Sequence, residues 1–377
     1  GTTVDFAPRL SIVFDAGELQ GVRARALSPL YRPLMDQLRE RARQAMAHPR
    51  SPEDQVGAWH ATSQWKLLVR ERERDYRPFF IDAPICAFVG VGDRDPAASR
   101  FAARIAVSLA HTDHWHYTFQ QGFPGSTWDI RGFPEAFVTG AIALAMDWAG
   151  CWLTPEAAEL LRFAIATKGL PKVREVMLQW EYLWDGNQGH MIGLGRILGL
   201  LAVERGWPRV RDDIDQFERD VREMTDRYVQ PDGSTHEGVG YWSNTFRATM
   251  PGLAVLARYR GKPLADLVPP RLASTWSYIG ALLSTAGEPG SYLPIADTVG
   301  NAPYSRVYRV LATRGRLLLV LATLPEMLRA PWVNATSTHR IVAGPAAERV
   351  DDLRTLVDLA VDGRFAPLID SRFTFDE

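Results

Sequence analysis

Apolar residues at three- and four-residue spacing run through most of this chain, and this spacing restricts the fold more than any other feature. From about position 32 to 285, short loops rich in Gly, Pro, Asp and Asn separate the repeats of the pattern, and the alternation typical of strands is scarce. We therefore expect a mainly α fold in which successive helical hairpins build an incomplete (α/α) toroid. The predicted helices are residues 34–46, 55–69, 101–109, 137–148, 155–166, 191–203, 214–228 and 246–259.

One helix start can be predicted from its capping residues. Thr154 stands before Pro155, which suits the first helical position because its missing N–H would have no helical partner there. Glu156 follows in the first turn, where the helix dipole favours a negative charge. We expect Thr154 to be an N-cap.

The pattern changes after about Pro294. Gly315 and Arg316 form a turn signal before the apolar run 317–321, which predicts a buried strand. A second strand is expected at 339–343, a helix at 350–361 and a third short strand at 367–369. This order is typical of an α/β segment. We place the boundary near Ala296, which gives a helical domain at 1–296 and a small α/β segment at 297–377.

Charge and apolar runs exclude some classes of partner. The formal net charge is −1, from 43 basic and 44 acidic residues, so no overall electrostatic attraction to nucleic acid or to an anionic membrane is expected. No run approaches the roughly 18 apolar residues of a membrane span, and no signal segment opens the chain. Cys86 and Cys151 each lie in an apolar run, which favours buried thiols over a disulfide or a metal pair.

Two polar, glycine-spaced segments stand before apolar helices. The first is residues 184–190, Trp-Asp-Gly-Asn-Gln-Gly-His, and the second is residues 231–242, Pro-Asp-Gly-Ser-Thr-His-Glu-Gly-Val-Gly-Tyr-Trp. On composition alone they are a helix entry and a turn. As loops at helix N-termini, however, they place amides and polar side chains where anions are favoured, and the two loops could face one another.

Both segments resemble motifs of the heparinase II/III-like and alginate-lyase-like polysaccharide lyases. That family carries an asparagine and a histidine before one helix, as Asn187 and His190 stand here, and a tyrosine in an Asp-Gly…Glu-Gly-x-Gly-Tyr context before a later one. The spacing from Asn187 to Tyr241, 241 − 187 = 54 positions, is in keeping with the family. Weaker similarities extend the resemblance over about residues 8–297. They are Arg9-Leu10, Phe14, Glu18-Leu19, Asp113-His114-Trp115, Asp147-Trp148 and 293–297.

The resemblance implies β-elimination across a 4-linked uronic acid. Asn187 and Gln188 would neutralise the enolate-like intermediate, and Tyr241 would act as base or acid. Because the reference pKa of tyrosine is about 10, Tyr241 needs a nearby positive charge or a dry pocket. The expected catalytic residues are Tyr241, Asn187 and His190, the expected substrate-binding residues are Gln188, Glu237, Trp242, Trp184, His236 and Arg247, and His190, His236 or Arg247 would supply the positive charge.

Two other site readings are rejected from spacing. His111, His114 and His116 do not match a clear zinc pattern, and we expect no metal. Gly193, Gly195 and Gly199 lack the spacing of a dinucleotide loop and no strand precedes them, so we expect no cofactor there.

The C-terminal segment resembles another family. Residues 314–320 and 352–370 are similar to the late Rossmann strand, helix and strand of a medium-chain dehydrogenase/reductase of the quinone-oxidoreductase kind. The glycine-rich phosphate loop of that family is missing. The β-sheet domains that normally follow the helical domain of the lyases are missing as well, so we expect a chimeric or truncated reading frame.

The sequence therefore predicts a polysaccharide lyase-like protein that cleaves uronic-acid-containing glycans, alginate or a glycosaminoglycan, with activity impaired by the absence of the β-sheet domains. Its expected partner is an acidic polysaccharide or oligosaccharide, without nucleic acid, membrane or cofactor. The alternatives are a noncatalytic glycan-binding toroid and a fragment of a zinc-independent NADPH quinone oxidoreductase-like protein. The lyase resemblance implies a periplasmic or secreted protein.

Overall fold

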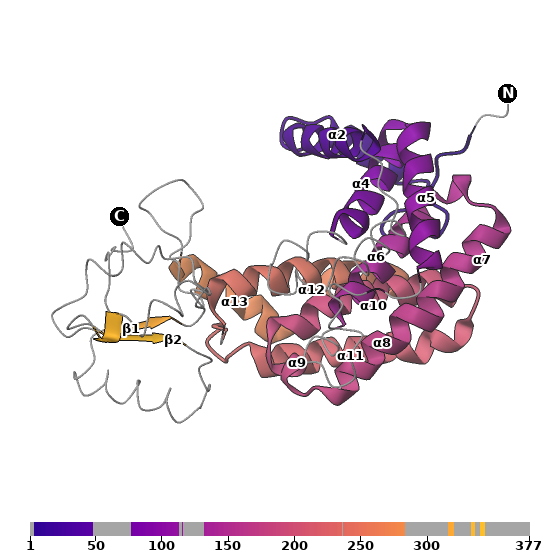
Figure 1. Ribbon diagram of the computed structural model, residues 1–377. Coiled ribbons are helices and arrows are strands. Elements are labelled where there is room, and N and C mark those ends of the chain that lie inside the picture. The colour runs from indigo at the N-terminus through magenta and orange to yellow at the C-terminus, as the bar shows by residue number, and fades with distance from the viewer. Residues whose placement is uncertain are drawn as a thin grey trace. The chain divides into compact units, whose positions relative to one another are not determined.

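The computed structural model describes residues 4–47, 77–112, 115, 132–235, 237–282, 316–319, 333–335 and 340–343 (Figure 1). The expected helices at 55–69 and 350–361 and the strand at 367–369 lie outside these residues. Within them the protein is mainly helical, so the predicted fold class is confirmed at that level. The helices are α1 (Leu19–Ala26), α2 (Arg32–Ala47), α4 (Arg77–Asp93), α5 (Pro96–His111), α6 (Phe133–Trp148), α7 (Pro155–Ala164), α8 (Leu170–Gln179), α9 (Tyr182–Asp185), α10 (Asn187–Glu204), α11 (Arg211–Tyr228), α12 (Gly238–Arg260) and α13 (Pro270–Leu282).

The predicted N-cap is confirmed. The Thr154 hydroxyl accepts a hydrogen bond from the amide of Ala157 at 3.2 Å, and Pro155 opens α7. A five-residue π-helical stretch, Ile165–Gly169, joins α7 to α8. The expected helix at 155–166 is thus the first part of a longer helical run.

Helix α4 was not predicted, because it lacks the one-sided pattern of a surface helix. Its sequence is apolar on all sides, and Ala83, Cys86 and Ala87 are fully buried. Both cysteines are free thiols, and burial raises the pKa of the Cys86 thiol to about 12. The expectation of a buried thiol is therefore confirmed for Cys86, whereas Cys151 is only partly buried.

Among the described glycines, the one that lies closest to another backbone joins α10 to α6. A Cβ atom built on Gly195 would lie 1.9 Å from the Ala136 carbonyl oxygen, and one on Gly199 would lie 2.4 Å from Thr139 Cγ2. Since residues 136 and 139 face residues 195 and 199 in the same order, the two helices run parallel. The glycine series that superficially resembles a dinucleotide loop is therefore a helix-packing surface, as expected from its spacing.

Helices α10, α11 and α12 form successive hairpins. Gly189 lies against Met224 and Gly193 against Phe217, so α11 runs antiparallel to α10. A Cβ on Gly252 would touch both Phe217 and Ile197, which places α12 beside both helices. A largely buried ion pair, Arg196 to Asp220 at 2.5 Å, also joins α10 to α11.

A single buried carboxylate holds the N-terminal segment. Asp147, at the end of α6, accepts hydrogen bonds from the amides of Leu10 (2.7 Å), Ser11 (2.8 Å) and Ile12 (2.9 Å). Burial raises the pKa of Asp147 despite these bonds. Next to it, the Phe14 ring stacks on Trp148 with centroids 5.7 Å apart. The early sequence similarities at 9–19 and 147–148 are thus parts of one contact.

The C-terminal segment is described only at a few positions. Strands β1 (Arg316–Leu319) and β2 (Arg340–Ala343) pair in parallel with Leu317 opposite Ile341. Both lie where strands were expected, whereas the rest of the predicted α/β segment is outside the described residues. The chain divides into one compact unit of residues 1–236 with 241–277 and a second of 237–240 with 278–377. The predicted domain boundary near Ala296 stays a prediction.

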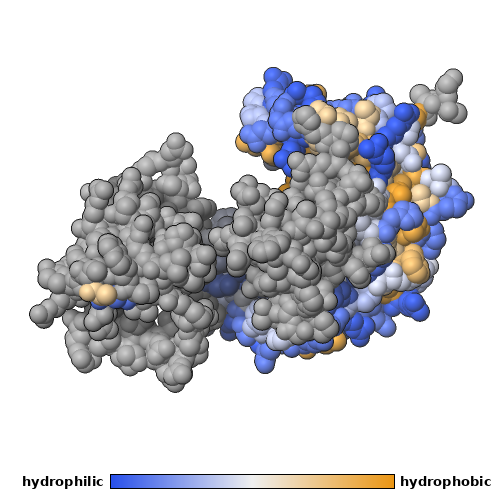
Figure 2. Space-filling model, in the orientation of Figure 1, coloured by the Kyte–Doolittle hydropathy of each residue, from blue (hydrophilic) through white to orange (hydrophobic). Residues whose placement is uncertain are grey.

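Among the described residues no helix is long and apolar enough to cross a bilayer. On the face drawn in Figure 2, hydrophilic residues predominate among the coloured residues and apolar ones are scattered between them.

We predict that Gly195→Ala destabilises the protein by roughly 1–3 kcal/mol, because the added methyl group forces the α6 and α10 backbones apart. Denaturant unfolding measures the effect. Gly193→Ala is the matched control on the same helix. Its new Cβ would meet Phe217 Cε2 at an ordinary 3.4 Å, and the substitution raises the helix propensity by the same amount as Gly195→Ala. Equal free energies of unfolding for the two variants would show that the contact between α6 and α10 at Gly195 tolerates a methyl group.

Candidate functional site

The first motif opens α10 rather than forming a loop. Gly186 is the extended N-cap residue, and Asn187, Gln188 and His190 lie in the first helical turn. The short helix α9 precedes it, and Arg227 of α11 holds α9 through two hydrogen bonds to Asp185, at 2.8 and 3.0 Å. The predicted loop was therefore too long, although its side chains do stand at a helix N-terminus.

A glycine allows the first motif to pack tightly. A Cβ on Gly189 would lie 2.3 Å from the Leu183 carbonyl oxygen and 2.7 Å from Met224 Sδ. Any larger residue would push α10 away from α9 and α11. This glycine therefore has a structural reason to stand between Gln188 and His190.

His190 is buried and neutral. Its side chain is 2% exposed, and burial lowers its pKa to about 4, although the nearby Met224 carbonyl acts in the opposite direction. Nδ1 lies 2.9 Å from the Thr249 hydroxyl, which joins α10 to α12, and the ring centroid is 5.8 Å from that of Tyr228. Our expectation that His190 could supply a positive charge to Tyr241 is wrong on this count, because a neutral imidazole carries none near pH 7.

The second motif also lies on a helix. Helix α12 begins at Gly238, with φ of +80°, which is 246 − 238 = 8 residues earlier than expected. Tyr241, Trp242 and Arg247 are therefore helical residues, and Glu237 directly precedes the helix. Tyr241 is half-buried, while Arg247 is exposed and donates a hydrogen bond to Asn244 at 3.1 Å. His236 lies outside the described residues.

The Pro-Asp-Gly sequence before this helix is a turn, as its composition predicts. The Asp232 carboxylate accepts hydrogen bonds from the Ser234 amide (2.9 Å) and hydroxyl (2.7 Å), which holds its pKa below the usual range. Gly233, with φ of +86°, packs against the Ser274 carbonyl at the start of α13. This part of the motif has a structural role.

The aromatic residues of the site differ in exposure. Trp242 is 6% exposed and stacks on Phe246 with centroids 5.0 Å apart. Trp276 of α13 completes this aromatic cluster, with its ring 5.5 Å from Phe246, and is 61% exposed. Trp184 is half-buried, and its indole N–H donates to the Met177 carbonyl at 2.9 Å. The exposed ring that can stack on a ligand is therefore Trp276, a residue that the sequence did not single out.

Three buried polar atoms of the predicted residues make no hydrogen bond of normal geometry. They are Gln188 Oε1, His190 Nε2 and Trp242 Nε1. Buried polar atoms are nearly always satisfied in folded proteins, and an unsatisfied one costs free energy. All three atoms are shielded from solvent, and the Met224 carbonyl lies near the His190 ring, so the two motifs contain buried polar groups and do not present them openly.

Sequence reasoning missed the residue that links the motifs. Thr249 lies two turns after Tyr241 on α12, and no local pattern marks it as the partner of His190. Asn187 is 3% exposed, so the first motif presents Gln188 and the half-buried Trp184 to solvent more than Asn187 itself. The structure thus brings the first motif together with the helix of the second, and buries the asparagine and the histidine.

The described pockets lie elsewhere. None of the three pockets whose linings fall within the described residues includes a predicted site residue. Across those same ranges no group of three or more His, Cys, Asp or Glu side chains could hold a metal, and His114 and His116 are not described. Comparison with protein-family models and with curated proteins gave no match, so the lyase resemblance rests on the quoted residues.

The burial of His190 predicts a pH dependence of stability. Because its folded pKa of about 4 lies below the unfolded value of about 6.5, the unfolded chain binds the proton first. Stability is therefore lost as the pH falls from about 6.5 to about 4, by on the order of 3 kcal/mol in total from this group. Denaturant unfolding across this range should show a shallower slope for His190→Gln than for the wild type.

His111→Gln is the control for this experiment. His111 ends α5 and is exposed, so its substitution should leave the slope unchanged. A wild-type slope that His190→Gln does not reduce would contradict a buried, neutral His190.

Proposed function

We propose that this protein is polysaccharide lyase-like and that its helical part binds uronic-acid-containing glycans, alginate or a glycosaminoglycan, for β-elimination. The observation that carries the proposal is the His190–Thr249 hydrogen bond at 2.9 Å. It joins the first motif to the helix that carries Tyr241. Both motifs stand at the N-terminal ends of their helices, where backbone amides favour an anionic ligand.

The relative direction of these helices supports a common site. Residues 190 and 197 of α10 lie near residues 249 and 252 of α12, so the two helices run in the same direction. Tyr241 is 249 − 241 = 8 residues before Thr249, or about 12 Å along the helix axis. Asn187 is three residues before His190, or about 4.5 Å. The two therefore differ by about 8 Å in height, a separation that a short oligosaccharide can span.

The directions of the helices also support an (α/α) toroid, which we propose as the fold. Helices α6, α10 and α12 run parallel, and α11 returns antiparallel between α10 and α12. Alternating inner and outer helices of this kind are how an incomplete (α/α) toroid is built from hairpins. In such a fold the N-terminal ends of the inner helices gather on one face, with the two motifs among them.

We assign the roles as follows. Tyr241 removes the proton next to the substrate carboxylate and protonates the leaving oxygen, while Gln188 and the amides at the start of α10 stabilise the negative charge that develops. His190, being neutral and buried, is a positioning residue that holds α12 through Thr249. Arg247 remains the described cation nearest to Tyr241 along α12, six residues away.

A second candidate function is noncatalytic glycan binding. The aromatic cluster of Trp242, Phe246 and Trp276 favours it, because the exposed Trp276 ring presents a flat apolar face of the kind on which sugar rings stack. This function needs neither a competent base nor the β-sheet domains of the lyase family. Binding and turnover must therefore be measured separately.

We predict that the purified chain releases unsaturated uronate products from at least one of alginate, heparan sulfate, hyaluronan and chondroitin. Absorbance of the new double bond measures the rate. Tyr241→Phe should lower the rate roughly 100-fold or more, because it removes the acid–base group and keeps the ring. Tyr31→Phe, at an exposed tyrosine between α1 and α2, is the matched control and should retain the rate.

The outcome distinguishes the two candidates. Product formation that Tyr241→Phe leaves unchanged would refute the assigned mechanism. Calorimetric binding without products, weakened by Trp276→Ala, would favour the glycan-binding function. Neither products nor binding with any of the four glycans would exclude both.

A further inference from the structure

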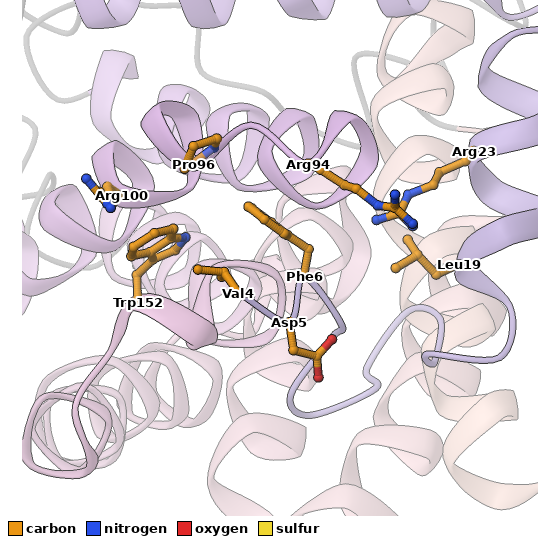
Figure 3. Close-up of a pocket in the computed structure, with 9 residues that line it drawn as sticks. All are labelled: Val4, Asp5, Phe6, Leu19, Arg23, Arg94, Pro96, Arg100 and Trp152. Carbon is orange, nitrogen blue, oxygen red and sulfur yellow. The ribbon is translucent and has the colours of Figure 1, made fainter. Parts of the chain in front are cut away.

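A separate pocket lies between the N-terminal segment, α1 and the start of α5. It has a volume of about 670 Å³, within the range of small-molecule sites, and Figure 3 shows the side chains that line it. Three arginines and one aspartate, Asp5, supply its charged groups, while Phe6 and Trp152 supply its aromatic walls. None of these residues belongs to either motif of the proposed glycan site.

Two of the arginines bring like charges together. Arg23 of α1 donates hydrogen bonds to the carbonyls of Val91 (2.8 Å) and Gly92 (3.0 Å), which fixes its guanidinium at the end of α4. Arg94 lies beside it, and burial, together with the positive charge of Arg94, lowers the pKa of Arg23. Figure 3 shows the two guanidinium groups meeting at one side of the pocket.

Arg94 is held in an unfavourable backbone conformation. Its φ is +58°, in the left-handed region that glycine adopts easily and other residues adopt at a cost. Among the described residues Arg94 makes no ion pair, whereas its neighbour Asp93 is taken by Arg39 at 2.7 and 2.9 Å. Arg94 therefore stands in a strained conformation beside another arginine with no ion pair of its own among the described residues, and such strain often marks a functional position.

The opposite wall offers an unused donor. The indole N–H of Trp152 is buried and makes no hydrogen bond. Arg100 of α5 stacks its guanidinium over the Trp152 ring at 4.1 Å, and the Phe6 ring meets the same indole edge-on at 6.4 Å. This wall can hold an apolar or aromatic body and donate one hydrogen bond to it.

We propose that this pocket binds a small organic anion, a carboxylate or a phosphate monoester, with its charged group at Arg23 and Arg94 and its apolar body against Phe6 and Trp152. Both charged groups accept hydrogen bonds from planar guanidinium groups. Binding relieves the repulsion between the two arginines, because the ligand adds a negative charge beside Arg94, which makes no ion pair among the described residues.

Isothermal titration of the full chain with benzoate and with phenyl phosphate, at about 20 mM ionic strength so that screening is weak, tests the proposal. We expect at least one of them to bind, and the tighter of the two identifies the charged group. Benzamide, the neutral counterpart of benzoate, should bind at least about tenfold more weakly than that anion.

Substitution of Arg94 separates binding from folding. Arg94→Gly removes the charge and suits the left-handed backbone, so we expect at least about tenfold weaker anion binding with a melting temperature no lower than that of the wild type. Arg25→Gln, at an exposed arginine of α1 outside the pocket lining, should bind as the wild type does. The proposal is overturned if neither anion binds, if benzamide binds equally well, or if Arg25→Gln weakens binding as much as Arg94→Gly.

Discussion

The close approach of α6 and α10 is the contact from which the rest of the helical unit is built. At Gly195 the two backbones meet with no room for a side chain, and Gly199 and Thr139 continue the contact one turn later. Interiors packed this closely respond to small changes in volume, so the position of α10 is fixed to within a methyl group. Because α11 packs on α10, and α12 packs on both, the start of each candidate motif follows from this one crossing.

The same packing explains why the conspicuous residues of the first motif are buried. The first motif stands at the start of a helix that crosses the core tightly, so neighbouring helices enclose Asn187 and His190. Of the two residues between them, only Gln188 reaches solvent, because Gly189 is buried. Burial in turn lowers the pKa of His190 and keeps it uncharged, which suits a residue that links helices and does not suit one that neutralises a substrate carboxylate. His190 therefore gives no positive charge to Tyr241, the base that we propose.

Apolar spacing predicted α2 and α11 to within one turn, and the capping residues predicted the start of α7. The spacing placed the start of α5 five residues late and did not predict α1, α8 or α13. It did not predict α4, whose apolar residues surround the helix, or the early starts of α10 and α12, whose glycines are typical of loops. Glycine lowers helix propensity, but at Gly189 and Gly195 close packing requires it within the helix. The Thr249 partner of His190, 59 positions away, was out of reach because only tertiary packing brings the two together.

The N-terminal segment shows how one carboxylate can connect two otherwise separate sites. Asp147 binds three consecutive amides of this segment at the end of α6, the helix whose other end packs on α10. Arg258 of α12 holds the same segment from the opposite side, with hydrogen bonds to the Ser11 carbonyl at 3.0 Å and to the Asp15 carboxylate at 2.7 Å. The wall that Phe6 gives to the arginine pocket is therefore anchored to α6 and α12. Since α12 also carries Tyr241, the proposed glycan site and the arginine pocket are both held by this helix while they share no residue.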